Sequence, residues 1–291
     1  MIAIIGASGF IGSSLVEALI SQKREPLAID IVKPKGNHNW LIADIVEPAT
    51  IERIFFEYSV ETVIHLVGLP QIGLCEKDPQ FSYLLNTQSV HNTLEAMRKT
   101  AVQKVIFASS AAVYGPYDGV VSEEKEPTPN TIYGYHKYVS EELIKAYSTS
   151  YGINFTTLRL FNVYGQDPQL GKDVVSIFVR HAKNGEPLVV KGKNKYRDFV
   201  HVKDVTKAFI ASIPAHANNR IINVGTGVKV TLGELVDIIR EVLPRIKVKY
   251  EIAADDGKGL VADNELCRSL LNLAPINPHD GIKEHIKRYA T

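Results

Sequence analysis

The sequence predicts an α/β fold in which a doubly wound parallel sheet is followed by a smaller mixed α/β lobe. In the first half of the chain, short runs rich in β-branched residues alternate with stretches whose apolar residues recur at helical spacing. The runs are apolar on both faces, as is typical of central strands in a parallel sheet that helices cover on both sides. After about residue 165, glycine and proline become denser and this alternation is lost.

The predicted strands and helices follow one another along the chain. Strands are expected over residues 2–5, 26–30, 40–43, 62–67, 104–108 and 155–160. Helices are expected over residues 11–20, 50–58, 79–100, 133–151, 173–184, 232–243 and 264–271. This order places a first domain at residues 1–165 and a second at 166–291. Residues 198–224 contain a further strand and helix that could return to the first domain.

The composition favours a globular protein without a strongly charged partner. The 291 residues are 45% hydrophobic and 22% charged, with a net charge of +1, which predicts no nucleic-acid or membrane partner. The two cysteines form neither a disulfide framework nor a zinc-ligand pattern, and no cluster of side chains suggests a metal. No apolar run reaches the roughly 18 residues of a membrane span, and the first residues do not resemble a signal peptide. We therefore expect a cytoplasmic protein.

A turn containing Gly6, Gly9 and Gly12 joins the first predicted strand to the first helix. Gly6 permits a tight turn, Gly9 lets the backbone approach a pyrophosphate, and Gly12 lets the helix lie close to the strand. The N-terminus of the helix would supply N–H groups and the positive end of its dipole to the phosphates. The usual spacing is G-x-G-x-x-G, whereas the spacing here is G-x-x-G-x-x-G. The alternative is a glycine turn that binds no ligand. Its place between a strand and a helix favours a dinucleotide.

Asp30 ends the second predicted strand, where a carboxylate can accept hydrogen bonds from ribose hydroxyls and repel a 2′-phosphate. It therefore favours NAD over NADP. The alternative is a solvated loop acid, and Lys33 or Lys35 would weaken the argument if either folded back onto the site. Asp44, at the end of the third strand, is a weaker candidate near the adenine.

Tyr133 and Lys137 lie four residues apart at the start of a predicted helix and so share one face. A tyrosine is a poor base at its ordinary pKa of about 10, but a nearby ammonium group favours the phenolate. Ser110 ends the fifth predicted strand and could hydrogen-bond the same substrate oxygen. A Tyr–Lys pair alone is usually a surface pair. Together with the glycine turn, it predicts proton transfer beyond the carboxyl ends of the strands.

The sequence resembles the extended short-chain dehydrogenases/reductases, and within them most closely the UDP-glucose 4-epimerases and their nucleotide-sugar relatives. The motifs that carry the resemblance are GASGFIG (6–12), Asp30, Asp44-Ile45, VIHLVGLP (63–70), Asn86, SSAAVYG (109–115), YGYHK (133–137), LRLFNVYG (158–165), RDFVHVKDV (197–205) and NVGTG (223–227). The resemblance implies a Rossmann domain that binds NAD at 1–165 and a nucleotide-sugar-binding domain at 166–291.

The resemblance also implies roles for individual residues. Tyr133 would be the base, Ser110 its hydroxyl partner, and Lys137 the group that binds ribose and tunes Tyr133. Asn162 and Arg197 would contact the substrate diphosphate, with Ser110 and Tyr133 at the sugar. Cofactor contacts are expected at Gly6, Gly9, Phe10, Ile11, Gly12, Asp30, Asp44, Ile45, Leu66, Asn86, Ser109, Tyr133 and Lys137.

The implied reaction is 4-epimerisation of a nucleotide sugar through a 4-keto intermediate, with UDP-glucose and UDP-galactose as the first guess. The implied assembly is a homodimer, in which the helices 79–100 and 133–151 pair across a twofold axis. The alternative is that these helices only cover the sheet. Galactose use and surface-polysaccharide synthesis remain open as pathways.

Two departures from relatives narrow the function. The 4,6-dehydratases carry Asp-Glu after the active-site serine, whereas this chain has Ala111-Ala112, which argues against dehydration. The 4-epimerases present an arginine where this chain has residues 253–256, Ala-Ala-Asp-Asp, so the sugar and the nucleotide stay open. A lysine such as Lys172, Lys191 or Lys258 could help Arg197, and Leu260 does not settle tolerance of N-acetyl sugars. A 4-keto-sugar reductase that uses NAD(P)H is the alternative enzyme, and a silent dinucleotide-binding regulator is the non-enzymatic one.

Overall fold

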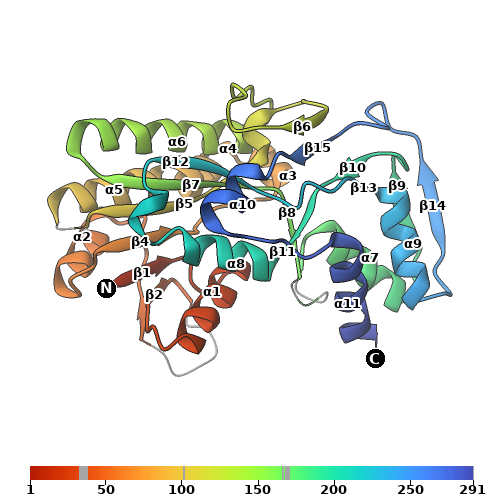
Figure 1. Cartoon of the computed structure of the whole chain (residues 1–291), viewed down its shortest axis with the longest axis horizontal. Coiled ribbons are helices and arrows are strands. Elements are labelled where there is room, and N and C mark those ends of the chain that lie inside the picture. Colours follow the sequence, from red (N-terminus) through yellow and green to blue (C-terminus); the bar gives the residue numbers. More distant parts are fainter. Residues whose placement is uncertain (33–38, 101, 166, 168–170, 291) are drawn as a thin grey trace. The chain divides into compact units, whose positions relative to one another are not determined.

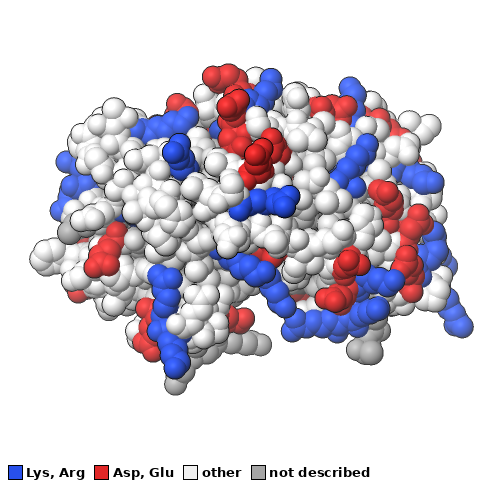
Figure 2. Space-filling view, viewed as in Figure 1, with Lys and Arg blue, Asp and Glu red and all other residues white. Residues whose placement is uncertain are grey.

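The computed structural model describes residues 1–32, 39–100, 102–165, 167 and 171–290. Figure 1 shows its helices and strands. Lys33 and Lys35, which bear on the argument from Asp30, lie outside the described residues. Of the helices described, none is both long and apolar enough to cross a membrane. On the face displayed in Figure 2, Lys and Arg side chains are interspersed with Asp and Glu.

Seven strands form the main sheet, in the order β12-β7-β5-β4-β1-β2-β3. Their bounds are β1 Ile2–Ile5, β2 Leu27–Asp30, β3 Trp40–Ile42, β4 Thr62–His65, β5 Lys104–Ser110, β7 Asn154–Leu160 and β12 Arg220–Val224. β1 runs parallel to β2 and β4, β2 to β3, and β4 to β5. The predicted α/β fold with its doubly wound sheet is therefore confirmed. The strand order reverses between β1 and β4, and ligands of such sheets bind beyond the carboxyl ends of the strands at this point.

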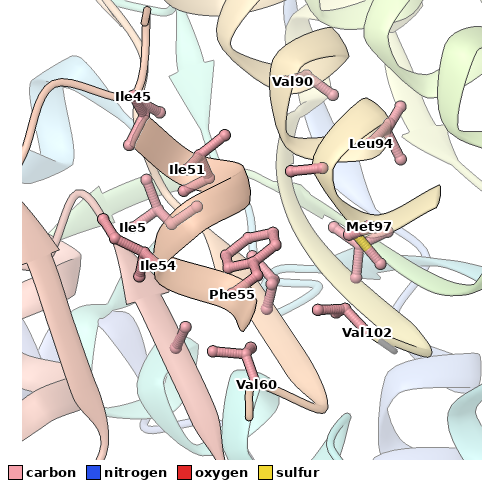
Figure 3. Close-up of a cluster of buried hydrophobic side chains, with 14 of the residues drawn as sticks. Ile5, Ile45, Ile51, Ile54, Phe55, Val60, Val90, Leu94, Met97 and Val102 are labelled. Carbon is pink, nitrogen blue, oxygen red and sulfur yellow. The ribbon is translucent and has the colours of Figure 1, made fainter. Parts of the chain in front are cut away.

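Helices cover both faces of this sheet. They are α1 Phe10–Ser21, α2 Pro48–Glu57, α3 Ile72–Lys77, α4 Pro79–Tyr83, α5 Ser89–Lys99, α6 Ile132–Tyr151 and α8 Val202–Ala211. Figure 1 shows α5 and α6 on one side of the sheet and α1 and α8 on the other. Figure 3 shows how Ile54 and Phe55 of α2 and Leu94 and Met97 of α5 pack together in the core. Full burial of each such side chain stabilises the fold by about 1.5–3 kcal/mol.

The predicted uninterrupted helix over 79–100 is wrong in one respect. Between α4 and α5, the segment Leu84–Gln88 is π-helical. Two polar residues of this segment are buried and bonded to α6: Ser140 Oγ donates to the Asn86 carbonyl at 2.7 Å, and Thr87 Oγ1 donates to the His136 carbonyl at 3.2 Å. Such π-bulges occur often at functional sites.

The chain divides into two compact units. The first comprises residues 1–116, 125–159 and 206–222, and the second comprises residues 117–124, 160–205 and 223–291. Residues 206–222 thus return to the first unit, where β12 forms an edge of the seven-stranded sheet. Residues 117–124, placed in the first domain by the sequence pattern, belong to the second unit because β6 Gly119–Val121 pairs with β15 Gly259–Ala262. The binding roles expected for the two domains remain predictions.

The second unit has its own sheets and its own core. Its other strands are β8 Asn162–Tyr164, β9 Leu188–Lys191, β10 Tyr196–Arg197, β11 Phe199–His201, β13 Val230–Thr231 and β14 Val248–Glu251. Its helices are α7 Val174–Lys183, α9 Leu232–Val242, α10 Glu265–Leu271 and α11 Pro278–Ala290. The strands form the sheet β13-β10-β15-β6 and the pairs β11-β8 and β14-β9. Buried side chains of α7, α9 and α11 make the core, and a capping box of Thr231 and Glu234 starts α9.

His65 provides a test of burial in the first unit. His65 is the last residue of β4, and its side chain is fully buried. Burial and the charge of Lys137 lower its pKa to about 3. The unfolded chain takes up this proton near pH 6.5, whereas the folded protein does not until about pH 3. We therefore expect His65 to reduce the free energy of unfolding by about 1.4 kcal/mol per pH unit as the pH falls through this window. In urea unfolding, the free energy of unfolding of wild type minus that of His65→Gln should be about 2 kcal/mol smaller at about pH 5 than at about pH 7. A difference independent of pH would contradict this.

Candidate active site

The glycine turn lies at the carboxyl end of β1. Gly6 has φ +84°, and a Cβ on Gly12 would lie 2.2 Å from the Gly6 carbonyl oxygen, so side chains are excluded at both positions. Gly9 precedes α1 as its N-cap, without a side-chain hydrogen bond to the helix. The N–H groups of Phe10, Ile11 and Gly12 begin the helix and have no acceptor within it. This cradle of free N–H groups fits the diphosphate of a dinucleotide.

Asp30 lies beside this turn. Its carboxylate accepts hydrogen bonds from the backbone N–H groups of Ser8, at 2.9 Å, and Ile31, at 2.7 Å. The acid at the end of β2 is therefore held against the glycine turn, where a ribose contact is expected. Asp44 is exposed, and Ile45 is buried in the core, so Ile45 can reach a cofactor only through its main chain. These cofactor contacts stay predictions.

The loop after β4 holds a close approach between two other predicted residues. A Cβ on Gly68 would lie 2.7 Å from Asn86 Oδ1 and 3.2 Å from Lys137 Nζ. Asn86 is buried, and its amide exchanges hydrogen bonds with Leu69, accepting from the N–H at 3.0 Å and donating to the carbonyl at 3.3 Å. Leu66, earlier in this loop, is bonded by its N–H to Ile5 of β1 at 2.9 Å. No pattern singled out Gly68, although it lies within the motif VIHLVGLP.

The start of α6 lies against the turn that follows Ser110. Thr131 caps the helix, since its hydroxyl accepts a hydrogen bond from the Gly134 N–H at 3.1 Å. A Cβ on Gly134 would lie 2.6 Å from the carbonyl oxygen of Ala112, in the 3-10 turn Ala111–Tyr114. This approach brings Tyr133 near enough to Ser110 for the serine hydroxyl to lower the pKa of Tyr133.

Burial dominates the electrostatics of this pair and of Lys137. Burial raises the pKa of Tyr133 to about 12, and the hydrogen bond with Ser110 opposes this increase. Burial lowers the pKa of Lys137 to about 8, while the charge of Glu141 acts in the opposite direction. Lys137 Nζ donates a hydrogen bond to the Ala108 carbonyl at 2.8 Å. The structure thus brings Ser110 and Tyr133 together, and the tuning of Tyr133 by Lys137 stays a prediction.

Two other side chains near the site were not expected from the sequence. Cys75 is buried, and its electrostatic interaction raises the pKa of both Tyr133 and Lys137. Glu141, one turn after Lys137 on α6, accepts a hydrogen bond of 2.5 Å from Ser109 Oγ. Because this hydroxyl already donates its hydrogen, the cofactor contact expected at Ser109 would have to use its oxygen as an acceptor or use its main chain.

The predicted diphosphate contacts lie in the second unit. Asn162 begins β8, and its side-chain amide donates to the Asp198 carbonyl at 3.2 Å. Arg197 is half-buried at the end of β10, and Nη1 donates to the Tyr196 carbonyl at 2.8 Å. The carboxylate of Asp198 is fully buried and accepts hydrogen bonds from Thr226, Gly227 and Ala262, which ties the motif NVGTG to β15.

The acidic pair in the stretch that lacks the expected arginine is tied to its surroundings. Asp255 forms an ion pair of 2.5 Å with Lys195. Burial lowers the pKa of Arg197, and the charge of Asp255 partly opposes this decrease. Asp256 accepts backbone hydrogen bonds from Asn194, at 2.7 Å, and Lys195, at 3.1 Å. Lys195 is therefore the partner of these acids, a lysine that no sequence pattern singled out. Within the described ranges, no group of three or more His, Cys, Asp or Glu side chains could hold a metal ion.

Gly68→Ala tests the packing of the site. The new methyl group would press on Asn86 Oδ1 and displace Asn86 and Lys137, both expected to contact the cofactor. We expect affinity for NAD, measured by calorimetric titration, to fall about tenfold or more, which is about 1.4 kcal/mol. Gly73→Ala is the matched control, since a Cβ there meets no atom within 4 Å. An unchanged affinity in a folded Gly68→Ala protein would contradict the expectation.

Comparison with known proteins agrees with this geometry. The sequence model described as the NAD dependent epimerase/dehydratase family matches residues 2–225. A protein of Methanocaldococcus jannaschii, provisionally described as a UDP-glucose 4-epimerase, is 38% identical over 99% of this chain and 96% of its own.

Solved structures share the fold over nearly the whole chain. The UDP-glucose 4-epimerase of Thermotoga maritima with UDP-glucose has a TM-score of 0.91 and 27% identity, covering 99% of this chain and 98% of its own. The UDP-N-acetylglucosamine 4-epimerase of Methanobrevibacter ruminantium, in complex with UDP-N-acetylmuramic acid, has a TM-score of 0.89 and 29% identity, covering 99% and 97%. The resemblance predicted from the motifs is confirmed, as is NAD as the cofactor of this family. This chain belongs to the NAD dependent epimerase/dehydratase family.

Proposed function

We propose that this protein is an NAD-dependent nucleotide-sugar 4-epimerase, with UDP-glucose and UDP-galactose as the first substrates to test. The observation that carries the proposal is the approach of Tyr133 to Ser110, whose hydroxyl lowers the pKa of Tyr133, with Lys137 one helical turn further on α6. The relatives named above are described as 4-epimerases that differ in their sugars. They support the reaction class and leave the sugar open.

In this proposal Tyr133 takes the proton of the sugar 4-hydroxyl and later returns it, while Ser110 hydrogen-bonds the same oxygen. A phenol whose pKa is about 12 is almost fully protonated at neutral pH, so its ionisation needs a positive charge nearby. Lys137, whose pKa is about 8, is mostly charged at neutral pH and can provide it. NAD, which Gly6, Gly9, Gly12 and Asp30 would hold, would supply a reversible hydride acceptor for C4 of the sugar, so that no net NADH would be formed.

Ala111 and Ala112 support epimerisation over elimination. They follow Ser110 directly in a 3-10 turn, and neither side chain can act as an acid or a base. A 4-keto-sugar reductase would use the same three residues, but it would consume one reduced cofactor per product.

Anchoring of the substrate falls to the second unit. We propose that Asn162 and Arg197 contact the diphosphate, while the hexose stays free to turn. The negative charge of Asp255 acts on Arg197, and Asp255 is also paired with Lys195. How strongly Arg197 attracts the diphosphate therefore depends on how far Lys195 neutralises Asp255. Leu260 of β15 is placed beside Arg197 in the sheet register and is the residue to change when N-acetyl sugars are tested.

Turnover of UDP-galactose is the first test. We expect an NMR time course with catalytic NAD to show UDP-glucose without net NADH. Tyr133→Phe should lower kcat by a factor of about 10²–10⁴, because the proton acceptor is lost. Tyr135→Phe, at an exposed tyrosine on the same helix, is the control. Conversion of no nucleotide sugar in a panel, with reduction of a 4-keto sugar instead, would replace the epimerase by the reductase.

We also propose that the protein is a cytoplasmic homodimer that pairs through neighbouring helices of the first unit. Six large apolar side chains are exposed on α3, α4 and α6: Ile72, Leu74, Phe81, Tyr83, Tyr135 and Val139. α6 adjoins both α3 and α4. Exposed apolar surface gathered on adjacent helices is typical of protein–protein interfaces. Cys75 and Cys267 are both free and buried, which supports a reducing compartment.

Light scattering should therefore give twice the chain mass of 32.2 kDa. Val139→Glu places a charge in the proposed interface, and we expect it to shift the protein to the monomer mass. Phe56→Glu makes a similar change at a side chain that is 80% exposed on α2, away from these helices, and should leave the dimer intact. A monomeric wild type, or dissociation by both variants alike, would contradict the proposed interface.

A further inference from the structure

A buried ion pair lies behind the candidate site in the first unit. Arg159 of β7 donates two hydrogen bonds to Glu141 of α6, from Nε to Oε1 at 3.1 Å and from Nη2 to Oε2 at 2.7 Å. The exposed fractions of the two side chains are only 2% and 0%. Removing both charges from water costs about as much as their attraction returns, so such a pair is a poor source of stability. Its use is then to fix geometry, because the bidentate contact sets both distance and orientation.

The pair is connected to the strand that carries Ser110. Ser109 Oγ donates to Glu141 Oε1 at 2.5 Å, and this is the oxygen that also accepts from Arg159 Nε. The residue before Ser109, Ala108, accepts the hydrogen bond of Lys137 through its carbonyl at 2.8 Å. Three consecutive residues of β5 thus meet α6: Ala108 through Lys137, Ser109 through Glu141, and Ser110 through Tyr133.

The same arginine contacts the far end of the turn after Ser110. The guanidinium carbon of Arg159 lies 4.7 Å from the ring centroid of Tyr114, the last residue of the 3-10 turn Ala111–Tyr114. Tyr114 is itself fully buried. The segment from Ser109 to Tyr114 is therefore held at both ends by one ion pair. Between these ends, the Ser110 hydroxyl accepts a hydrogen bond from the Ala112 N–H at 3.1 Å.

We propose that the Arg159–Glu141 pair is a positioning device that, through Ser109 and Tyr114, holds the Ser110 hydroxyl where it can hydrogen-bond the sugar oxygen whose proton Tyr133 takes. Both side chains of the pair are buried, so in this proposal they act on the reaction only through their neighbours. The proposal rests on the proposed function for its effect on turnover, but the ordering of residues 109–114 is independent of it. Glu141 has a second effect, because its charge favours the protonated form of Lys137 against burial.

The test uses Ser109→Ala, which removes the connection and leaves the ion pair whole. Glu141→Gln would instead leave the charge of Arg159 buried without a partner and is expected to unfold the protein. The matched control is Ser212→Ala, since Ser212 is equally buried in the first unit and its hydroxyl donates to the Ala208 carbonyl at 2.7 Å, in α8. Each variant is assayed for amide hydrogen exchange at residues 110–114, and for kcat and KM with UDP-galactose at saturating NAD.

Ser109→Ala should speed exchange at residues 110–114 about tenfold and lower kcat about tenfold, with KM within about twofold of wild type. Ser212→Ala should change neither. Unchanged exchange in Ser109→Ala overturns the proposal, and so does faster exchange with wild-type kcat. If wild type converts no nucleotide sugar, the proposed function fails. The exchange data then decide by themselves whether the pair holds the segment.

Discussion

The packing of the start of α6 against the end of β5 is the constraint on which the candidate site depends. Gly134 follows Tyr133 directly, and any side chain there would push α6 away from the Ala112 carbonyl. Because Tyr133 and Lys137 belong to the same rigid helix, such a shift would move both from β5 at once. The approach of Tyr133 to Ser110 and the hydrogen bond between Lys137 and the Ala108 carbonyl would be lost together. A single glycine thus sets the geometry of three proposed catalytic groups.

On the cofactor side of the first unit, glycines again let the backbone lie close to neighbouring groups. Gly12 lets α1 lie on the Gly6 carbonyl, and Gly68 leaves room for the polar ends of Asn86 and Lys137. These positions follow β1 and β4, the two strands between which the sheet order reverses. The parallel sheet therefore decides where the site lies, and the glycines decide how near its polar groups can come.

Features that depend on local sequence could be predicted, and features that depend on distant partners could not. The strands at 2–5 and 62–65 and the helix at 132–151 follow from apolar periodicity and turn residues close in sequence. The π-helical segment at 84–88 has no such signal, because its residues bond to distant parts of the chain. The Leu69 N–H donates to the Asn86 side chain, and Ser140 Oγ donates to the Asn86 carbonyl. The membership of residues 117–124 in the second unit likewise depends on pairing with β15, far along the chain.

The candidate site shows the same division. The motifs identified Ser110, Tyr133 and Lys137, since these residues occur at a fixed spacing or at a strand end. They could not show that the hydroxyl of Ser109 is bonded to Glu141, or that Lys195 pairs with Asp255, because each bond joins elements whose approach is decided by the whole fold.

Burial has two opposite effects on the base proposed at Tyr133. It makes the phenolate a stronger base, and it makes that phenolate harder to form. A phenolate whose conjugate acid has a pKa of about 12 is a strong base, yet it is scarcely populated at neutral pH. Burial also works against the ammonium of Lys137, the charge that would favour this phenolate. The charge of Glu141, one turn further along α6, raises the pKa of Lys137 against this effect, and Arg159 donates a hydrogen bond to Glu141 from behind. The charges of Arg159, Glu141 and Lys137 therefore alternate in sign toward the site. The buried pair thus supports the acid–base chemistry proposed for Tyr133 as well as the position of Ser110.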